Sequence, residues 1–279
     1  AKGKLPAIVV IHENRGLNPH IEDITRRIAL DGYLAFAPDA MTPLGGYPGD
    51  EEKAVKMFGT LDPVARLNDL IAGANVVKTH AESNGRLGAV GFCFGGGICN
   101  IFATRMPDLL ASVPFYGAQP AAADVANIKS PLQIHYAGLD ERINAGWPAW
   151  EAALKANNVA YQGYIYPNVN HGFHNDTTPR YDKPAAELAW QRTLDAYYAA
   201  NMDLIDPLPV FNLYNFDWPI YTTYGPQPPS KVVQGADGSP SRAEDALLSP
   251  GTVITGGAVT PSVLSPAVWV ETGAQVSDS

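Results

Sequence analysis

The chain has 279 residues, 46% of them hydrophobic, which suffices for one large domain or one domain with a smaller appendage. Acidic residues outnumber basic ones by 28 to 19, and no stripe of Lys or Arg appears, so we expect no nucleic-acid partner. No apolar run reaches the length of about 18 residues typical of a membrane span. We therefore expect a cytoplasmic protein without membrane segments, although removal of an upstream segment stays an open alternative.

Residues 1–200 alternate between strand-like and helix-like patterns. The predicted strands cover residues 7–11, 34–37, 87–92, 112–116, 132–136 and 161–166. Helical spacing of apolar residues lies between them, around 21–28, 67–77, 96–106 and 147–156, and again at 186–197. This alternation predicts an α/β domain whose mostly parallel sheet carries helices on both faces.

Residues 201–279 have a different composition and are predicted to form an appended tail. Its first part is rich in proline, at positions 207, 209, 219, 226, 228 and 229. From Ala246 onward, apolar residues recur about every six positions: Val253, Val259, Val263 or Leu264, Val268 or Val270, and Val276. This spacing predicts a solenoid of short strands with about two coils, fewer than the roughly three needed for independent stability. We expect the tail to dock on the main domain, to pair with another chain, or to be mobile.

The sequence Gly91-Phe-Cys-Phe-Gly95 lies between a predicted strand and a predicted helix. A nucleophile at such a sharp turn needs very small residues two positions away on either side. The arrangement is typical of α/β-hydrolases and predicts Cys93 as a nucleophile, with the helix N-terminus favouring its thiolate. The alternative is a buried structural cysteine. Cys99, the other cysteine, forms no CxxC pair with it, which argues against a disulfide scaffold or a Cys-rich zinc site.

A nucleophile needs a base and a group that orients the base. In the chain order nucleophile, acid, histidine, the candidates are Asp140, just after the strand 132–136, and His171, after the strand 161–166. Glu141 and His174 are the competing acid and base. Three hydroxyl residues lie outside any strand–turn–helix elbow and are not predicted to be nucleophiles: Thr42, Ser83 and Ser112. Four histidines are interpreted as packed or solvated: His12, His20, His80 and His135.

The loop after the first strand is predicted to contribute to an oxyanion hole. One backbone N–H group would come from Asn14 and the other from Phe94, directly after the nucleophile. Glu13 would then lie close to Cys93. We expect this carboxylate to keep the thiol protonated at rest and to help form the thiolate when substrate displaces it. The alternative is a Glu13 that simply pairs with Arg15 or another cation.

Residues 5 to about 200 resemble the dienelactone hydrolase family. The resemblance rests on four motifs in order: His12-Glu-Asn-Arg-Gly-Leu17, Gly91-Phe-Cys-Phe-Gly-Gly96, Gly138-Leu-Asp140 and Asn170-His-Gly-Phe-His174. It implies Cys93 as nucleophile, His171 as base, Asp140 as its partner and Glu13 as the companion of the thiol.

One feature of the chain departs from this family. Members that hydrolyse dienelactone bind its carboxylate with arginines, one of them four residues after the triad histidine. Asn175 occupies that position here, and Arg180 is the nearest arginine downstream. An apolar pocket for neutral aryl or alkyl esters is the alternative, with a predicted lining of Tyr47, Phe94, Tyr116, Trp147 and Phe173.

The tail resembles the C-terminal part of bacterial glucose-1-phosphate adenylyltransferase, where the chain enters a left-handed β-helix. The similarity lies in residues 211–220 and 246–279. The nucleotidyltransferase domain is absent, so we expect a structural or oligomer-forming role, with a homo-oligomer as one outcome. A natural fusion, a rearranged gene and a cloning junction all fit this arrangement.

Together these features predict a hydrolase of small-molecule esters or lactones that acts through a thioester acyl-enzyme, without cofactor or metal. Activated aryl esters and phosphotriesters are expected as further electrophiles. Three alternatives stay open: a non-catalytic binding or assembly protein, a metal-dependent hydrolase using His12, Glu13, His171 and His174, and a nucleotide-sugar enzyme. The sequence offers neither an H-E-x-x-H motif for the second nor a phosphate-binding glycine loop for the third.

Overall fold

The computed structural model describes residues 4–201, 229–249, 251–260, 262–264 and 268–277. Its contacts divide the chain into two compact units, Ala1–Asn201 and Met202–Ser279. Each unit is described by itself. Residues 211–220, which carry part of the tail's resemblance, lie outside the described residues.

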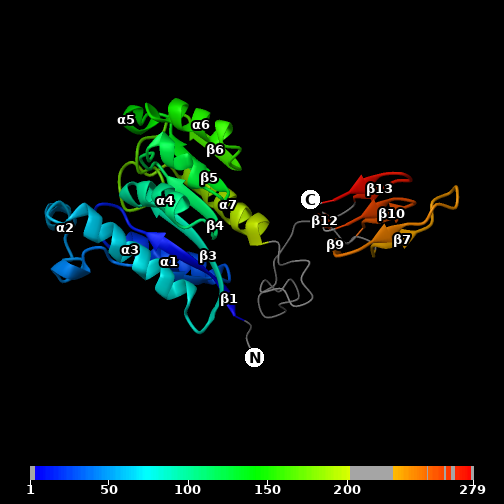
Figure 1. Cartoon of the computed structure of the whole chain (residues 1–279), viewed down its shortest axis with the longest axis horizontal. Helices are drawn as coiled ribbons and strands as arrows, with labels where there is room; N and C mark the ends of the chain where they lie inside the picture. The colour runs from blue at the N-terminus through cyan, green and yellow to red at the C-terminus, as the bar shows by residue number, and fades with distance from the viewer. Residues whose placement is uncertain (1–3, 202–228, 250, 261, 265–267, 278–279) are drawn as a thin grey trace. The chain divides into compact units, whose positions relative to one another are not determined.

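The first unit is built on a six-stranded sheet in the order β2-β1-β3-β4-β5-β6 (Figure 1). All of its strand pairs are parallel. The strands are β1 (Leu5–Ile11), β2 (Leu34–Phe36), β3 (Ser83–Phe92), β4 (Leu109–Phe115), β5 (Leu132–Ala137) and β6 (Tyr161–Tyr166). The prediction of a mostly parallel α/β sheet is confirmed, with β1, β3 and β4 beginning two to four residues earlier than expected.

Helices cover both faces of this sheet (Figure 1). α1 (Pro19–Leu30) and α7 (Lys183–Asn201) pack on one face. α3 (Pro63–Lys78), α4 (Phe94–Arg105) and α6 (Trp147–Ala156) pack on the other. Four shorter helices were not predicted: η1 (Thr42–Leu44), α2 (Glu51–Phe58), η2 (Ala122–Asn127) and α5 (Glu141–Asn144).

The alternation of side chains along β1 explains this layering. Ile8 and Val10 point into the core formed with α1 and α7, whereas Ala7, Val9 and Ile11 point into the core formed with α3 and α4. All five are fully buried. A strand buried on both faces must be continuously apolar, which is the pattern that the sequence has here.

Side-chain caps fix where the helices begin. The Asn18 side chain accepts the Ile21 N–H at the start of α1, and Pro19 occupies the first helical position. Asp62 caps α3 in the same way, followed by Pro63. Because α1 starts directly after the loop at the carboxyl end of β1, that loop, residues 12–18, is short and its far end is fixed by the cap.

The second unit is a three-sided solenoid. Its strands are β7 (Lys231–Val233), β8 (Arg242–Ala243), β9 (Ala246–Leu248), β10 (Val253–Thr255), β11 (Ala258–Val259), β12 (Ser262–Leu264), β13 (Trp269–Val270) and β14 (Gln275–Val276). They form the parallel sheets β13-β10-β7, β14-β11-β8 and β12-β9. Each strand therefore pairs with the strand three positions later, as expected when the chain winds around a triangular coil.

The solenoid differs from the prediction in its start and in one buried position. Its first coil begins at Lys231 rather than Ala246, so a third coil is under way before the described residues end. Ile254, not Val253, lies in the apolar interior, together with Val259, Leu264 and Val270. A period that drifts between five and six residues leaves such assignments uncertain by one position.

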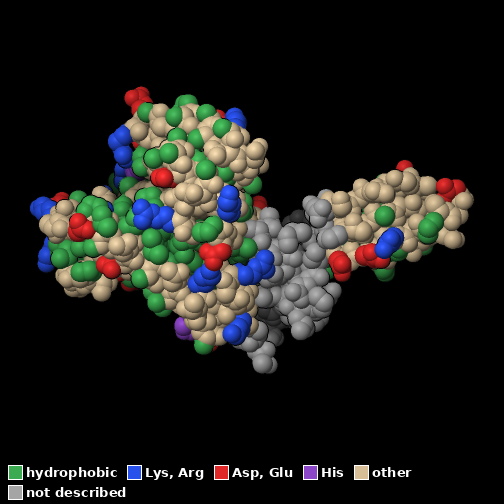
Figure 2. Space-filling view, viewed as in Figure 1, with side chains coloured by type: hydrophobic (Ala, Val, Ile, Leu, Met, Phe, Trp, Pro, Cys, Tyr) green, Lys and Arg blue, Asp and Glu red, His purple; other side chains and the backbone are tan. Residues whose placement is uncertain are grey.

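Two further features of the described residues are the distribution of surface charge and the length and hydropathy of the helices. On the face drawn in Figure 2, acidic and basic side chains of the first unit are interspersed rather than separated by sign. Within the described residues, no helix is both long and apolar enough to cross a membrane.

Candidate active site

Cys93 lies at the strained turn between β3 and α4. Its backbone adopts φ 55° and ψ −112°, a region that a non-glycine residue rarely occupies. A Cβ at Gly91 would overlap the carbonyl of Gly95, and one at Gly95 would overlap the carbonyl of Ile11. The predicted need for small residues on either side of the nucleophile therefore has a direct steric cause.

The same contacts place the turn between the ends of two neighbouring strands. Gly95 lies against Ile11 at the end of β1, so the loop that starts at His12 runs beside the first turn of α4. On the other side, the Cys93 N–H donates to the Phe115 carbonyl at the end of β4, with an N···O distance of 3.1 Å. Cys93 is consequently flanked by β1 and β4 at the carboxyl edge of the sheet.

His171 and Asp140 meet at this edge. Asp140 follows β5, and its Oδ2 lies 2.5 Å from Nδ1 of His171, in the loop after β6. Its Oδ1 accepts the Ile143 N–H at the start of α5, which orients the carboxylate. The Asp140 side chain is 6% exposed and that of His171 is 20% exposed, so the imidazole reaches solvent while its partner is shielded. This arrangement holds Nε2 free to exchange a proton.

The two competing residues lie in different environments. His174 is buried among Phe92, Phe115 and Trp190, and burial lowers its pKa to about 3. An imidazole inside the core cannot exchange protons with a substrate. Glu141 is the exposed first residue of α5, while the carboxylate that contacts His171 belongs to Asp140.

Glu13 is buried beside the elbow and is held by an amide. Its Oε2 accepts a hydrogen bond from Nδ2 of Asn175 at 3.1 Å, and both residues are buried. Arg15, the alternative partner, instead forms an ion pair with Glu51 of α2. The Glu13 carboxylate is thus bound by a neutral donor, which leaves its negative charge acting on the surroundings.

The pKa of Cys93 is raised to about 11, first by burial and then by the carboxylate of Glu13. The Phe94 N–H at the helix N-terminus, and the cations Arg142 and Arg180, act in the opposite direction. The N–H group at the helix N-terminus thus lowers the pKa of Cys93, as predicted, but burial and Glu13 raise this pKa by more. At pH 7 the thiol form of Cys93 therefore predominates.

Replacing Glu13 by Gln is expected to lower the pKa of Cys93, because the negative charge that opposes the thiolate disappears. Gln keeps an oxygen for the Asn175 amide. Alkylation of Cys93 by iodoacetamide at pH 8 should become about tenfold faster, and its pH profile should move to lower pH. Glu51→Gln removes the same charge from the Arg15 pair and serves as the control. A Glu13→Gln profile that overlays the wild-type profile would contradict this role.

Of the two residues predicted to supply the oxyanion hole, Phe94 belongs to the elbow and Asn14 to the loop that begins beside it. Phe94 begins α4, and its N–H is close enough to Cys93 to stabilise the thiolate. Its ring is held by Phe58 at a centroid distance of 4.8 Å and by the guanidinium of Arg66 at 4.5 Å. Asn14 lies in the turn closed by the Gly16 N–H and the Glu13 carbonyl, with an N···O distance of 3.3 Å.

The residues predicted to line a pocket separate into groups. Tyr47 packs near Gly16 and the η1 loop, and its N–H donates to Asp39 at 2.9 Å. Tyr116 and Phe173 have no exposed surface and contact each other at 5.6 Å between ring centroids. Trp147 packs over Gly163 and contacts Tyr136 and Tyr161, in the core between β5, β6 and α6. Tyr116 and Phe173 belong to one packed core cluster, and Trp147 is partly buried against another, so a substrate pocket lined by these residues stays a prediction.

Two arginines near the elbow were missed as a pair by sequence reasoning. The guanidinium of Arg180 packs over Gly172, which is directly after His171. Arg142 is two residues after Asp140 in the sequence. The positive charges of Arg142 and Arg180 both lower the pKa of Cys93. Both side chains are exposed. In the sequence Arg142 lies near Asp140 and Arg180 lies near His171, which indicates that the two could share a site. The family resemblance instead concerned the residue at position 175.

The four residues of the metal-site alternative do not converge. Nδ1 of His12 lies 2.5 Å from the Glu13 carbonyl, and its Nε2 accepts the Ala40 N–H at 3.0 Å, so both ring nitrogens are engaged. His174 is in the core. Among the described residues, no three His, Cys, Asp or Glu side chains are grouped as metal ligands would be.

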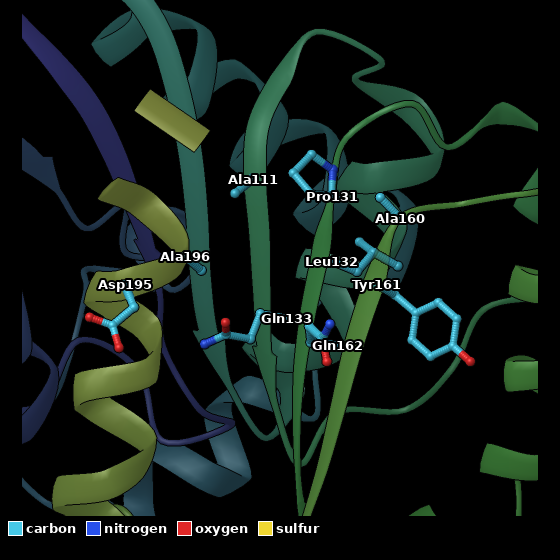
Figure 3. A pocket seen from close by; sticks show the side chains of 9 residues that line it. All are labelled: Ala111, Pro131, Leu132, Gln133, Ala160, Tyr161, Gln162, Asp195 and Ala196. Carbon is cyan, nitrogen blue, oxygen red and sulfur yellow. The ribbon is translucent and has the colours of Figure 1, made fainter. Parts of the chain in front are cut away.

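A cavity of about 660 Å³ lies at the opposite edge of the sheet from Cys93 (Figure 3). Its lining comes from the amino ends of β4, β5 and β6 and from α7, and includes Ala111, Leu132, Gln133, Tyr161 and Asp195. Because the strands are parallel, this cavity is separated from the elbow by the length of the sheet. It is not part of the candidate active site.

The family model of the dienelactone hydrolase family matches residues 1–200. The chain belongs to the dienelactone hydrolase family. A curated relative, the "Putative carboxymethylenebutenolidase" of Escherichia coli O157:H7, is 34% identical over 210 residues, which span 69% of this chain and 76% of the relative. The protein is thus a member of a hydrolase family.

Solved structures agree with this assignment. The solved structure of a "Putative Dienelactone Hydrolase" from Klebsiella pneumoniae subsp. pneumoniae is 28% identical in sequence to this chain, with a TM-score of 0.64. The match covers 71% of this chain and 88% of the Klebsiella chain. A promiscuous phosphotriesterase of dienelactone hydrolase-like type from metagenomic libraries has 23% identity and a TM-score of 0.60, covering 71% and 87%. The second similarity shows the fold alone.

The solenoid of this dienelactone hydrolase family member has relatives of its own. The model described as "GlmU-like, C-terminal hexapeptide" matches residues 228–279. Glucose-1-phosphate adenylyltransferase of Kocuria rhizophila is 49% identical over 105 residues, which are 38% of this chain but only 25% of that protein. The predicted resemblance of the tail is confirmed.

Proposed function

We propose that this protein cleaves carboxylic esters or lactones by two-step acyl transfer, with Cys93 as nucleophile, His171 as base and Asp140 as the group that orients the base. The observation that carries the proposal is the strained elbow at Cys93, at the same sheet edge as a hydrogen-bonded His171–Asp140 pair. Membership in the dienelactone hydrolase family supports the same reading.

In the first step the Cys93 thiolate attacks the carbonyl carbon, and the oxygen becomes an anion. The N–H groups of Asn14 and Phe94 bind this anion, and loss of one such donor costs about a hundredfold in rate. The thiol proton that Glu13 has accepted passes to His171, which donates it to the leaving alkoxide and is left neutral. In the second step His171 removes a proton from water, which attacks the thioester and releases the acid, and this proton returns to the Cys93 thiolate.

Glu13 acts before the first step. Its carboxylate, together with burial, keeps Cys93 protonated at rest, which protects the sulfur from oxidation and unproductive alkylation. When a substrate enters and displaces the carboxylate, Glu13 accepts the thiol proton. The neutral Asn175 partner favours this role, because a hydrogen bond from an amide is easier to break than an ion pair.

The direct test is a panel of p-nitrophenyl esters and lactones. With activated aryl esters, we expect a burst of p-nitrophenol equal to the concentration of enzyme, followed by slower turnover, because the thioester accumulates. Mass spectrometry of the quenched enzyme should find the acyl group on the peptide that contains Cys93. A panel with no turnover would favour the alternative of a non-catalytic binding or assembly protein.

We extend the proposal to neutral substrates, including activated aryl phosphotriesters. Asn175 replaces the arginine that would bind a carboxylate, and a thiolate attacks phosphorus as well as carbonyl electrophiles. The same panel includes an aryl phosphotriester, and undetectable turnover of it would remove this extension while leaving ester hydrolysis intact.

For the C-terminal solenoid we propose an assembly role. Its apolar row of Ile254, Val259, Leu264 and Val270 runs through the second coil into the third, and Val232, Val233 and Trp269 are exposed on β7 and β13. Stacking of such coils between chains would cover these side chains. Sedimentation of the full chain as a monomer at all concentrations would contradict this role.

A further inference from the structure

Tyr116 has two energetically unfavourable features that no contact in its surroundings explains. Its side chain has no exposed surface, and its hydroxyl has no hydrogen-bond partner among the described residues. Its backbone also has φ 38°, in the left-handed region that a bulky aromatic residue rarely adopts. An unpaired buried hydroxyl and a strained backbone at one residue point to a role outside packing.

The backbone places Tyr116 directly beside the nucleophile. The Cys93 N–H donates to Phe115, and the Tyr116 N–H donates to the His135 carbonyl at 2.7 Å. The ring contacts the imidazole of His171 at a centroid distance of 4.9 Å. The hydroxyl also responds to charge on Glu13, Cys93 and Arg180, so it lies within electrostatic range of all three.

The order of strands in the sheet shows on which side of the elbow the Tyr116 hydroxyl lies. Asn14 follows β1 and Tyr116 follows β4, and these strands flank β3 on opposite sides. Tyr116 is therefore on the side of His171 and on the opposite side of β3 from Asn14. Burial raises its pKa well above the usual value, and Glu13 and Cys93 raise it further, so the hydroxyl stays a proton donor.

We propose that Tyr116 is a positioning residue whose hydroxyl donates a hydrogen bond to the Cys93 sulfur once the thiol has lost its proton. In the resting protein this hydroxyl has no hydrogen-bond partner among the described residues, so its hydrogen bond to the sulfur forms only with the thiolate. Glu13 on one side then favours the thiol, and Tyr116 on the other side favours the thiolate. The inference deepens the proposed function, because it concerns the nucleophile of that same site.

The test compares Tyr116→Phe with Tyr197→Phe. Tyr197 is also fully buried with an unpaired hydroxyl, but it lies on α7 against Gly88, in the middle of β3. We expect Tyr116→Phe to slow iodoacetamide alkylation of Cys93 about tenfold at pH 8 and to move the profile to higher pH. Tyr197→Phe should leave the profile unchanged. Neither variant should lower the melting temperature, since each loses a buried hydroxyl without a partner.

Two outcomes would overturn the inference. One is a Tyr116→Phe profile identical to that of the wild type, which would mean that the hydroxyl does not reach the sulfur. The other is a melting temperature that falls for Tyr116→Phe but not for Tyr197→Phe, which would make the hydroxyl a structural group. Alkylation needs no ester turnover, so an enzyme inactive on every ester would refute the proposed function without deciding this inference.

Discussion

With Cys93 replaced by Ser, kcat/KM for ester hydrolysis is expected to fall by at least about a thousandfold. Serine fits the same cramped elbow, because its side chain is no larger than that of cysteine. Its hydroxyl is far harder to ionise than a thiol, and the site that raises the pKa of Cys93 to about 11 opposes an alkoxide even more strongly. The measurement is steady-state hydrolysis of p-nitrophenyl esters, with circular dichroism to confirm folding.

Cys99→Ala is the matched control for this substitution. Cys99 is fully buried in α4, one and a half turns from Cys93, and burial raises its pKa beyond any catalytic range. We expect its loss to lower stability by about 1 kcal/mol through a small cavity while the burst of p-nitrophenol persists. Wild-type activity in Cys93→Ser would instead assign the chemistry to another nucleophile.

The carboxyl edge of the sheet, with its candidate site residues, was predictable because these residues obey local rules. The glycines at 91 and 95 are dictated by contacts that a Cβ would make, and a strained turn of this kind has few sequence solutions. Asp140 and His171 each follow a strand of a parallel sheet, and the carboxyl ends of such strands converge. Their order along the chain therefore predicted which side chains meet.

Other parts depend on packing that no local pattern contains. Trp147 and Phe173 are aromatic residues near site motifs, yet Phe173 belongs to one core cluster and Trp147 is partly buried against another. The effect of Glu13 on the pKa of Cys93 was expected from the sequence, whereas the larger effect of burial requires the folded chain. Tyr116 was assigned to an apolar lining, because neither its unpaired hydroxyl nor its backbone strain is visible in sequence.

The short helices illustrate a different limit. α2 and α5 span eight and four residues, too few for an apolar period to stand out. Asp140 is both the N-cap of α5 and the partner of His171, so a loop prediction missed that the helix start holds the acid in place. Structure at such positions is set by capping and tertiary contact rather than by propensity.

Asp140→Asn is expected to lower kcat by about a thousandfold to ten-thousandfold while the protein stays folded. Asparagine can still accept the Ile143 N–H at the start of α5, because it is as good an N-cap as aspartate. It cannot stabilise the imidazolium of His171, and its amide can donate to Nδ1, which would place the proton on Nε2 and block the base. The measurement is the burst and steady-state rates on an activated aryl ester.

Glu141→Gln separates this effect from a general loss of negative charge, since Glu141 is adjacent in sequence but exposed at the first turn of α5. We expect its rates to match those of the wild type. If Asp140→Asn kept full activity and Glu141→Gln lost it, the acid would be misassigned. If both kept full activity, His171 would need no carboxylate partner, and the 2.5 Å contact between Nδ1 and Oδ2 would be structural only. A selective loss at Asp140 is the result that ties the geometry at the sheet edge to proton transfer.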